Sequence, residues 1–103
     1  MMKECCRKYL DEQFGGDADV MGEIYSEYVS SVGAKLAEAD AALAAADWKA
    51  LDHAAHTMKG NALAAGDAEM SETAIALRKA AALSDAASAA SLVAKLKELA
   101  TLL

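Results

Sequence analysis

Apolar residues recur every three or four positions along most of this chain, which is the spacing of one face of an α-helix. In the long stretch that ends near Ala46 the stripe consists of Val20, Ile24, Tyr28, Val32, Leu36, Ala39 and Leu43. In the last stretch it consists of Leu92, Leu96, Leu99 and Leu103. The pattern predicts five helices: residues 3–14, a long second helix to about Ala46, residues 48–65, a fourth to about Leu83, and a last one carrying the leucine seam.

The expected helix boundaries coincide with residues that begin or end helices. Gly15-Gly16 favours non-helical backbone after the first helix, and Gly66 stands where a helix commonly ends. Gly33 is expected to kink the second helix. The residues at predicted N-cap positions, read as caps and nothing more, are Asp17, Asp47, Asp67 and Ser84.

Composition agrees with an all-helical chain. Apolar residues make up 55% of it, with no proline and with only one Trp, three Tyr and one Phe. Much of the apolar content is alanine, the best helix former, and the β-branched runs typical of strands are missing. We therefore expect an all-α fold, an antiparallel up-down four-helix bundle with an additional short N-terminal helix over one end, formed by residues 1–103 as a single domain.

Charge and cysteine content narrow the possible partners and the compartment. The net charge of −6 repels the phosphates of nucleic acids and anionic lipids, so neither is expected as a partner. No apolar run approaches the roughly 20 residues that span a bilayer, and no signal-like segment is evident. Cys5 and Cys6 are neighbours, a spacing that fits neither a disulfide framework nor a zinc knuckle. We expect reduced thiols, a cytoplasmic location and a monomer.

The third helix carries the candidate chemistry. Its predicted core face consists of Leu51, Ala54, Ala55, Met58, Ala62 and Ala65. At about 100° per residue, His56 points roughly 150° away from that face. Solvent access and the lack of an obvious structural duty make His56 the candidate reactive residue, against the alternative of an ordinary surface histidine.

The residues around His56 each have a physical use on an exposed face. Lys59, one turn along, can offer its ammonium to a phosphate on the imidazole. Gly60 lacks a side chain where one would crowd the ring, and its cost of about 1 kcal/mol in a helix interior implies close approach by a partner. Leu63 and Ala64 put apolar surface beside this polar spot, which suits docking of another protein. Asp52 flanks His56 one turn earlier.

The chain shows no sequence feature of an enzyme that makes or hydrolyses ATP. It has no nucleotide-binding loop, no paired-carboxylate magnesium site and no triad base beside a nucleophile. An exposed pair between a lysine and an anion contributes only about 0.2–1 kcal/mol, too little to activate a phosphoryl group. His53 and His56 could share a metal ion, but no third ligand is placed with them, so no metal site is expected. We expect a non-enzyme whose catalytic groups come from the protein that docks.

The segment Ala55-His56-Thr57-Met58-Lys59-Gly60, followed by Gly66, resembles the signature of bacterial histidine phosphotransfer (HPt) domains. The resemblance implies that His56 is phosphorylated, that Lys59 steadies the phosphate and that Gly60 keeps the surface open. It implies exchange with an aspartate on a response-regulator receiver domain, in a phosphorelay begun by a sensor or hybrid histidine kinase. The receiver would supply Mg²⁺, and no cofactor is expected in this chain.

The chain departs from that family pattern at two positions. Arg78 stands where many relatives have a glutamate, and Asp67 replaces a common alanine. Because the glutamate orients the histidine in phosphotransfer domains of chemotaxis kinases, that subtype is disfavoured, and Asp52 becomes a candidate to fix the ring of His56 by a hydrogen bond. The alternative function is a helical adaptor that binds a receiver or kinase without phosphotransfer.

Overall fold

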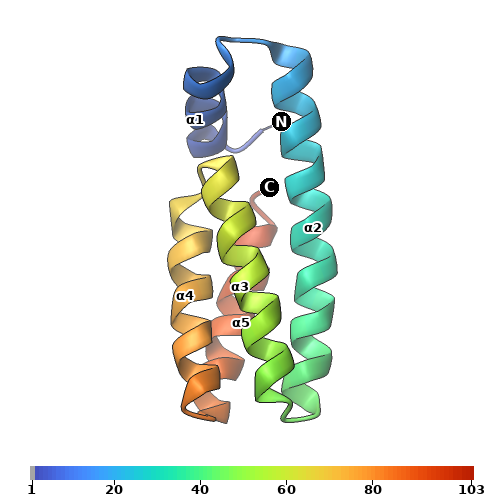
Figure 1. Cartoon of the computed structure of the whole chain (residues 1–103), viewed down its shortest axis with the longest axis vertical. Coiled ribbons are helices and arrows are strands. Elements are labelled where there is room, and N and C mark those ends of the chain that lie inside the picture. Colours follow the sequence, from blue (N-terminus) through green and yellow to red (C-terminus); the bar gives the residue numbers. More distant parts are fainter. Residues whose placement is uncertain (1) are drawn as a thin grey trace.

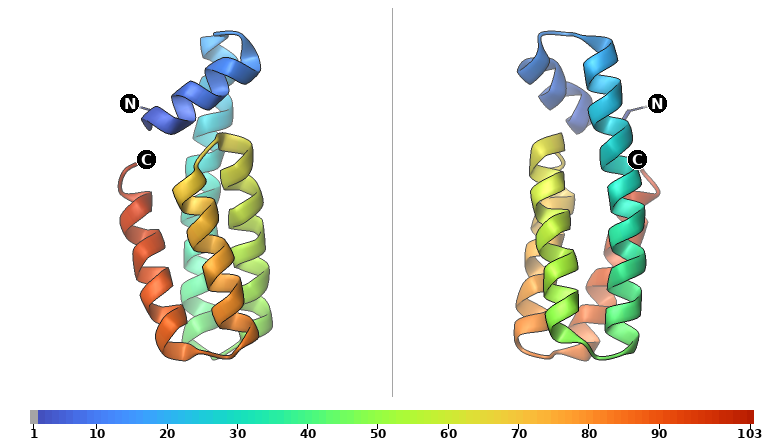
Figure 2. Two further views of the ribbon diagram at one scale, coloured as in Figure 1. Left: turned by 90° about the vertical axis from the view of Figure 1, so that its left-hand side faces the viewer. Right: turned by 45° about the vertical axis from the view of Figure 1, so that its right-hand side comes forward.

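A computed structural model describes residues 2–103, and within that range it contains five α-helices and no strand. The helices are α1 (Glu4–Phe14), α2 (Ala18–Ala44), α3 (Trp48–Ala65), α4 (Ala68–Ala82) and α5 (Ala86–Ala100). Helices α2 to α5 run up and down as an antiparallel bundle, and α1 lies across one end of it (Figure 1). Figure 2 shows α1 inclined to the bundle axis above the α3–α4 turn. The predicted all-α fold is confirmed.

Four of the five helices begin at an aspartate whose side chain accepts a hydrogen bond from a backbone N–H three residues on, which satisfies one of the free donors of the first turn. Asp17, Asp47 and Asp67 cap as predicted. The predicted cap of the last helix was wrong: Asp85, not Ser84, accepts from Ser88 N at 3.1 Å. Ser84 instead adopts the left-handed conformation, with φ 51°, in the turn before the cap.

The buried stripe of α2 differs from the predicted one at both ends. It consists of Met21, Tyr25, Tyr28, Val32, Leu36, Ala39 and Ala42. Ile24 and Leu43 are only partly buried, so the stripe is displaced by one position near each terminus. At the N-terminal end the reason is the chain preceding α1, because the backbone N–H of Lys3 donates to the hydroxyl of Tyr25 at 3.1 Å and covers that residue. The helix runs without interruption through Gly33.

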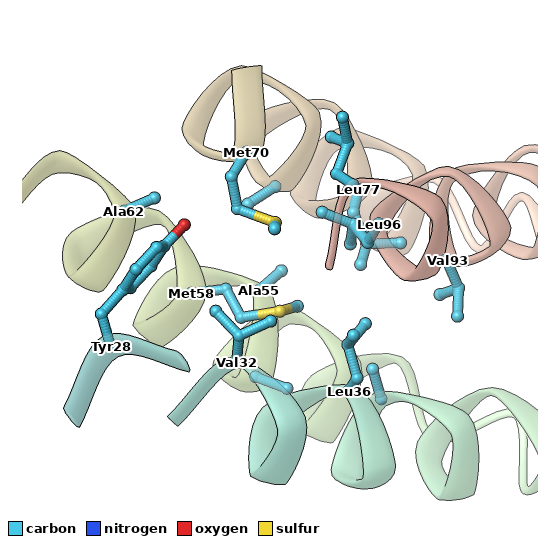
Figure 3. Packing of buried hydrophobic residues seen from close by; sticks show 14 of the residues in the cluster. Tyr28, Val32, Leu36, Ala55, Met58, Ala62, Met70, Leu77, Val93 and Leu96 are labelled. Atoms are coloured by element: carbon cyan, nitrogen blue, oxygen red, sulfur yellow. The ribbon is translucent and has the colours of Figure 1, made fainter. Parts of the chain in front are cut away.

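The core between the four bundle helices is built from aliphatic, methionine and alanine side chains. Figure 3 shows Met58 of α3 and Val32 of α2 in the same layer, with Leu77 and Leu96 facing them from α4 and α5. Helix α5 contributes Ala89, Val93, Leu96 and Leu99, whereas the predicted seam residues Leu92 and Leu103 are only partly buried. Alanine at many inward positions lets the helices approach closely, so α3 is held firmly between α2 and α4.

Helix α1 is joined to the bundle by buried contacts as well as by the chain. Cys6 and Leu10 of α1 are fully buried, and the side chain of Tyr9 packs directly on Gly66 at the α3–α4 turn. Asp67, also fully buried, accepts hydrogen bonds from Lys3 Nζ at 3.0 Å and from the Tyr28 hydroxyl at 2.8 Å. Asp67 is therefore more than a cap, because it fastens the N-terminal segment to two other elements. No helix within residues 2–103 is long and apolar enough to cross a membrane.

Candidate functional site

Helix α3 presents one buried face and one open face, as its periodicity predicts. All six predicted core residues, Leu51, Ala54, Ala55, Met58, Ala62 and Ala65, are buried. His56 lies on the opposite side and is exposed. An imidazole in this position can be reached by another protein without any rearrangement of the bundle.

The direction in which His56 points is fixed by contacts on both sides of α3. Toward α2, Asn61 Nδ2 donates to Ser31 Oγ at 2.6 Å. Toward α4, Arg78 Nε donates to Asp52 Oδ1 at 2.9 Å. Because both neighbouring helices hold α3 by polar contacts as well as by packing, α3 cannot rotate to bury the histidine without breaking them.

Asp52 does not form the hydrogen bond to His56 that its i−4 position made plausible. Its carboxylate pairs with Arg78, and the two side chains are 43% and 37% exposed. Arg78 was recognised from the sequence only as a departure from the family pattern. The signal that could have paired them is their opposite charge at facing positions of two consecutive antiparallel helices.

The turn that follows His56 carries a cation and then a position without a side chain. Lys59 is partly buried, and Gly60 is exposed. A Cβ built on Gly60 would meet no atom within 4 Å, so an alanine at this position would not touch the imidazole. The space above Gly60 is open to solvent, and whether a longer side chain there would crowd the imidazole stays a prediction.

Apolar surface continues along the same face toward the end of α3. Leu63, two turns after His56, is 55% exposed, and the neighbouring Ala64 is also exposed. An exposed leucine beside a reactive polar group is surface that a docking protein can bury. The structure thus places His56, Lys59, Gly60 and Leu63 on one open face of α3.

A groove of about 810 Å³ runs between α3 and α4, beside the candidate site. Its lining includes Asp52 and Lys59, the residues that flank His56 in the sequence, together with Arg78. Trp48, Lys49 and Lys79 also line this groove, and no pattern in the sequence marked them as part of one site. Their shared location depends on how α4 packs against α3, which periodicity within one helix does not specify.

The second histidine of α3, His53, is exposed as well. Within residues 2–103, no three His, Cys, Asp or Glu side chains gather into a group that could hold a metal ion. Thr57 follows His53 by one turn and donates its hydroxyl to the backbone oxygen of His53 at 3.2 Å. The two histidines therefore differ in the next helical turn: Lys59 and Gly60 follow His56, whereas Thr57 follows His53.

The fold and the site together define a class of protein that presents a nucleophilic side chain to a partner. The fold is a helical bundle, and the site is an exposed histidine on a firmly held helix, followed by a cation and an open glycine. The chain belongs to the Hpt domain family, whose model matches residues 23–103. Members of this family are phosphocarriers rather than kinases, and they serve histidine phosphotransfer in phosphorelays with two-component kinases and receivers. Neither the curated proteins nor the solved structures give a match to this chain.

Proposed function

We propose that His56 is the residue that accepts and donates the phosphoryl group, and that it exchanges this group with the aspartate of a response-regulator receiver domain. The observation that carries the proposal is the exposed position of His56 on α3, with Lys59 and Gly60 on the next turn. His53 is also exposed, but one turn after it stand His56 and Thr57 instead of a cation and a glycine.

The transfer is a displacement at phosphorus. The unprotonated ring nitrogen of neutral His56 attacks the phosphorus of the aspartyl phosphate in line, a P–N bond forms, and the P–O bond to the aspartate breaks. The aspartate leaves as a carboxylate, and the other ring nitrogen of His56 keeps its proton. The reverse displacement returns the phosphoryl group to a receiver, so the histidine is restored after each cycle.

The chain's own residues contribute position and charge. Lys59 can place its ammonium beside the phosphoryl oxygens, while Gly60 leaves room for the receiver's backbone. Leu63, Ala64 and Asp52 form the docking surface on either side. An exposed ammonium stabilises a phosphate by only about 0.2–1 kcal/mol, so the Mg²⁺ and most of the catalytic groups are assigned to the receiver.

We propose further that residues 1–103 act as one domain and as a monomer, in the cytoplasm. The fully buried Asp67 supports the single domain, because it binds Lys3 before α1 and Tyr28 of α2. The exposed large apolar residues come from several elements, which supports the monomer: Phe14, Val29, Leu63, Ile75, Leu83 and Leu102. Cys5 and Cys6 are both free thiols, as expected in a reducing compartment.

The test is transfer of labelled phosphate from a phosphorylated receiver domain of a cognate response regulator. We expect the intact protein to gain a label that is lost in acid and kept in base, as a phosphoramidate is. His56→Gln should gain none, whereas the matched control His53→Gln should be labelled like the intact protein. A label that survives in His56→Gln would assign the reaction to another residue.

The second candidate is an adaptor that binds a receiver or kinase without transfer, which the exposed Leu63 would serve equally well. It predicts no label on the intact protein and unchanged receiver binding by His56→Gln. The same experiment with a binding measurement, such as calorimetry, therefore separates the two functions.

A further inference from the structure

The groove between α3 and α4 has a charge opposite to that of the whole protein. Its lining contains four cations, Lys49, Lys59, Arg78 and Lys79, and a single carboxylate, Asp52. The chain as a whole has a net charge of −6 with only 10 Lys and Arg residues. The Asp52 carboxylate is already paired with Arg78, which leaves the three lysines without a neutralising charge inside the groove.

The groove on the other side of α3 shows that this charge is local. That groove, of about 240 Å³ between α2 and α3, is lined by Ile24, Glu27, Tyr28, Ser31, Asn61, Ala64 and Ala65. It contains one acidic residue and no basic one. The two sides of the helix that carries His56 therefore differ in polarity, and an acidic partner would be attracted only to the α4 side.

The spacing of the cations in the groove indicates the shape of the anionic ligand that they could bind. Lys49 and Lys59 are ten residues apart on α3, which is about 15 Å along a helix. Arg78 and Lys79 lie near the end of the antiparallel α4, beside the beginning of α3. A compact phosphate could reach only part of this row, whereas an extended peptide advances about 3.3 Å per residue and covers it with roughly five residues.

The rest of the lining also suits a polypeptide. Trp48 is partly buried and Ile75 is 39% exposed, so apolar surface lies between the charges. The groove is open along its length, whereas a small-molecule site commonly buries 70–90% of its ligand. Charge, length and openness together fit an extended acidic segment better than a nucleotide.

We propose that the α3–α4 groove binds an extended acidic segment of a partner protein, with its carboxylates on Lys49 and Lys79, its backbone over Trp48 and Ile75, and its end directed toward Lys59 beside the histidine. The assignment of this segment to a phosphorelay partner rests on the proposed function. The groove lies close to the proposed phosphorylation site. Asp52 and Lys59 border it, and His56 lies between these two residues in the sequence, within about 60° of each around the axis of α3. A segment bound here would hold the partner next to the histidine.

The test uses the only tryptophan of the chain, Trp48, as a reporter, because it lines the groove. The protein is titrated with a hexaglutamate peptide at low salt while Trp48 fluorescence is followed. We expect a saturable change that disappears near 1 M NaCl, where charges are screened beyond about 3 Å. Hexalysine should give no saturable change.

Two double variants change the net charge of the protein by the same amount, one inside the α3–α4 groove and the other outside it. Lys49→Glu/Lys79→Glu reverses two groove cations and should weaken hexaglutamate binding by about tenfold or more. Lys8→Glu/Lys95→Glu reverses two exposed lysines outside the groove and should bind as the intact protein does. Circular dichroism shows whether each variant is folded, and the salt titration of the intact protein tests the proposal even if one is not.

Three results would overturn the proposal. The first is no saturable change of Trp48 fluorescence with hexaglutamate. The second is hexaglutamate binding that is weakened equally in both double variants. The third is an equal fluorescence change with tripolyphosphate at the same concentration, which would show a site for a compact anion. His56→Gln should bind hexaglutamate normally. Loss of phosphate labelling and loss of peptide binding are therefore separate outcomes, and the failure of one proposal is distinguishable from the failure of the other.

Discussion

Gly60 is a residue whose presence the chain's own packing does not explain. A Cβ there would meet nothing within 4 Å, and φ is not in the left-handed region. A glycine inside a helix destabilises it by about 0.5–1 kcal/mol relative to alanine, because it loses more backbone freedom on folding. The cost is explained if the open space is used by a visiting protein.

Gly60→Gln should therefore separate stability from function. We expect the free energy of unfolding to rise by about 0.5–1 kcal/mol, because glutamine is a good helix former and its Cβ would meet no atom within 4 Å. Phosphotransfer from a receiver should become slower. The control is Gly22→Gln, at an exposed position in α2 that is equally open, where urea denaturation should show a similar gain and labelling should be unchanged. Equal transfer rates in both variants would contradict the role of Gly60.

At the residue scale, periodicity alone was enough to place His56 outward, because one helix has only one core face. It was not enough to find the partner of Asp52. Whether that carboxylate meets His56 on its own helix or Arg78 on the next one depends on the packing of α4 against α3, and the structure gives the bond to Arg78 at 2.9 Å.

At the scale of elements, the four turns of the chain share one construction. A residue in the left-handed conformation, with φ between 51° and 79°, is followed by the aspartate that caps the next helix. The pairs are Gly16-Asp17, Ala46-Asp47, Gly66-Asp67 and Ser84-Asp85. The left-handed residue ends one helix and the aspartate begins the next, so each connection is short and the successive helices α2 to α5 are antiparallel.

Of the turn glycines, Gly66 is the most constrained. Its φ is +75°, and a Cβ there would lie 2.2 Å from Cβ of Tyr9. Gly66→Ala should lower the free energy of unfolding by two contributions: about 1–2 kcal/mol from the left-handed backbone and about 1–3 kcal/mol from the clash with Tyr9. The control Gly15→Ala has φ +59° and free space, so it should show only the backbone cost. Equal losses in the two variants, by urea denaturation, would mean that Tyr9 does not rest on Gly66.

The turn before α5 gives a direct test of the corrected cap. Asp85→Ala removes the acceptor of the Ser88 N–H and should reduce the free energy of unfolding by about 1 kcal/mol. Ser84→Gly should stabilise the protein modestly, because glycine adopts a positive φ without strain. If Ser84 were the cap, as its sequence position suggested, chemical denaturation would show the larger loss at Ser84.

At the scale of the whole molecule, the attachment of α1 depends on buried polar groups around Asp67. Burial alone would lower the pKa of Lys3, but the hydrogen bond to Asp67 and its charge outweigh that effect and raise it. Burial, and then the hydrogen bond to Asp67, raises the pKa of Tyr28. Burial raises the pKa of the neighbouring Cys6 thiol to about 12. All three groups hold their protons more tightly in the folded protein.

The protein should therefore lose stability in alkali. Above pH 9.0, the ordinary value for a thiol, the unfolded chain releases a proton that folded Cys6 keeps until about pH 12, so the free energy of unfolding falls across that window. Urea denaturation at a series of pH values should show this decline, with a shallower slope in Cys6→Ala. Cys5→Ala removes only the contribution of the neighbouring thiol to the raised pKa of Cys6, which is smaller than that of burial, so it should flatten the decline less than Cys6→Ala does. An identical slope in Cys6→Ala would contradict the assignment.

The sequence by itself determined the number and class of the helices, the core face of α3 and the outward direction of His56, because these depend on periodicity and capping within about 20 consecutive residues. The tertiary structure decided which residues of neighbouring helices meet. It paired Asp52 with Arg78, fastened Lys3 and Tyr28 to Asp67, and gathered four cations into one groove. Those contacts depend on the relative rotation of packed helices, which many alanine-rich faces permit and only the complete core selects.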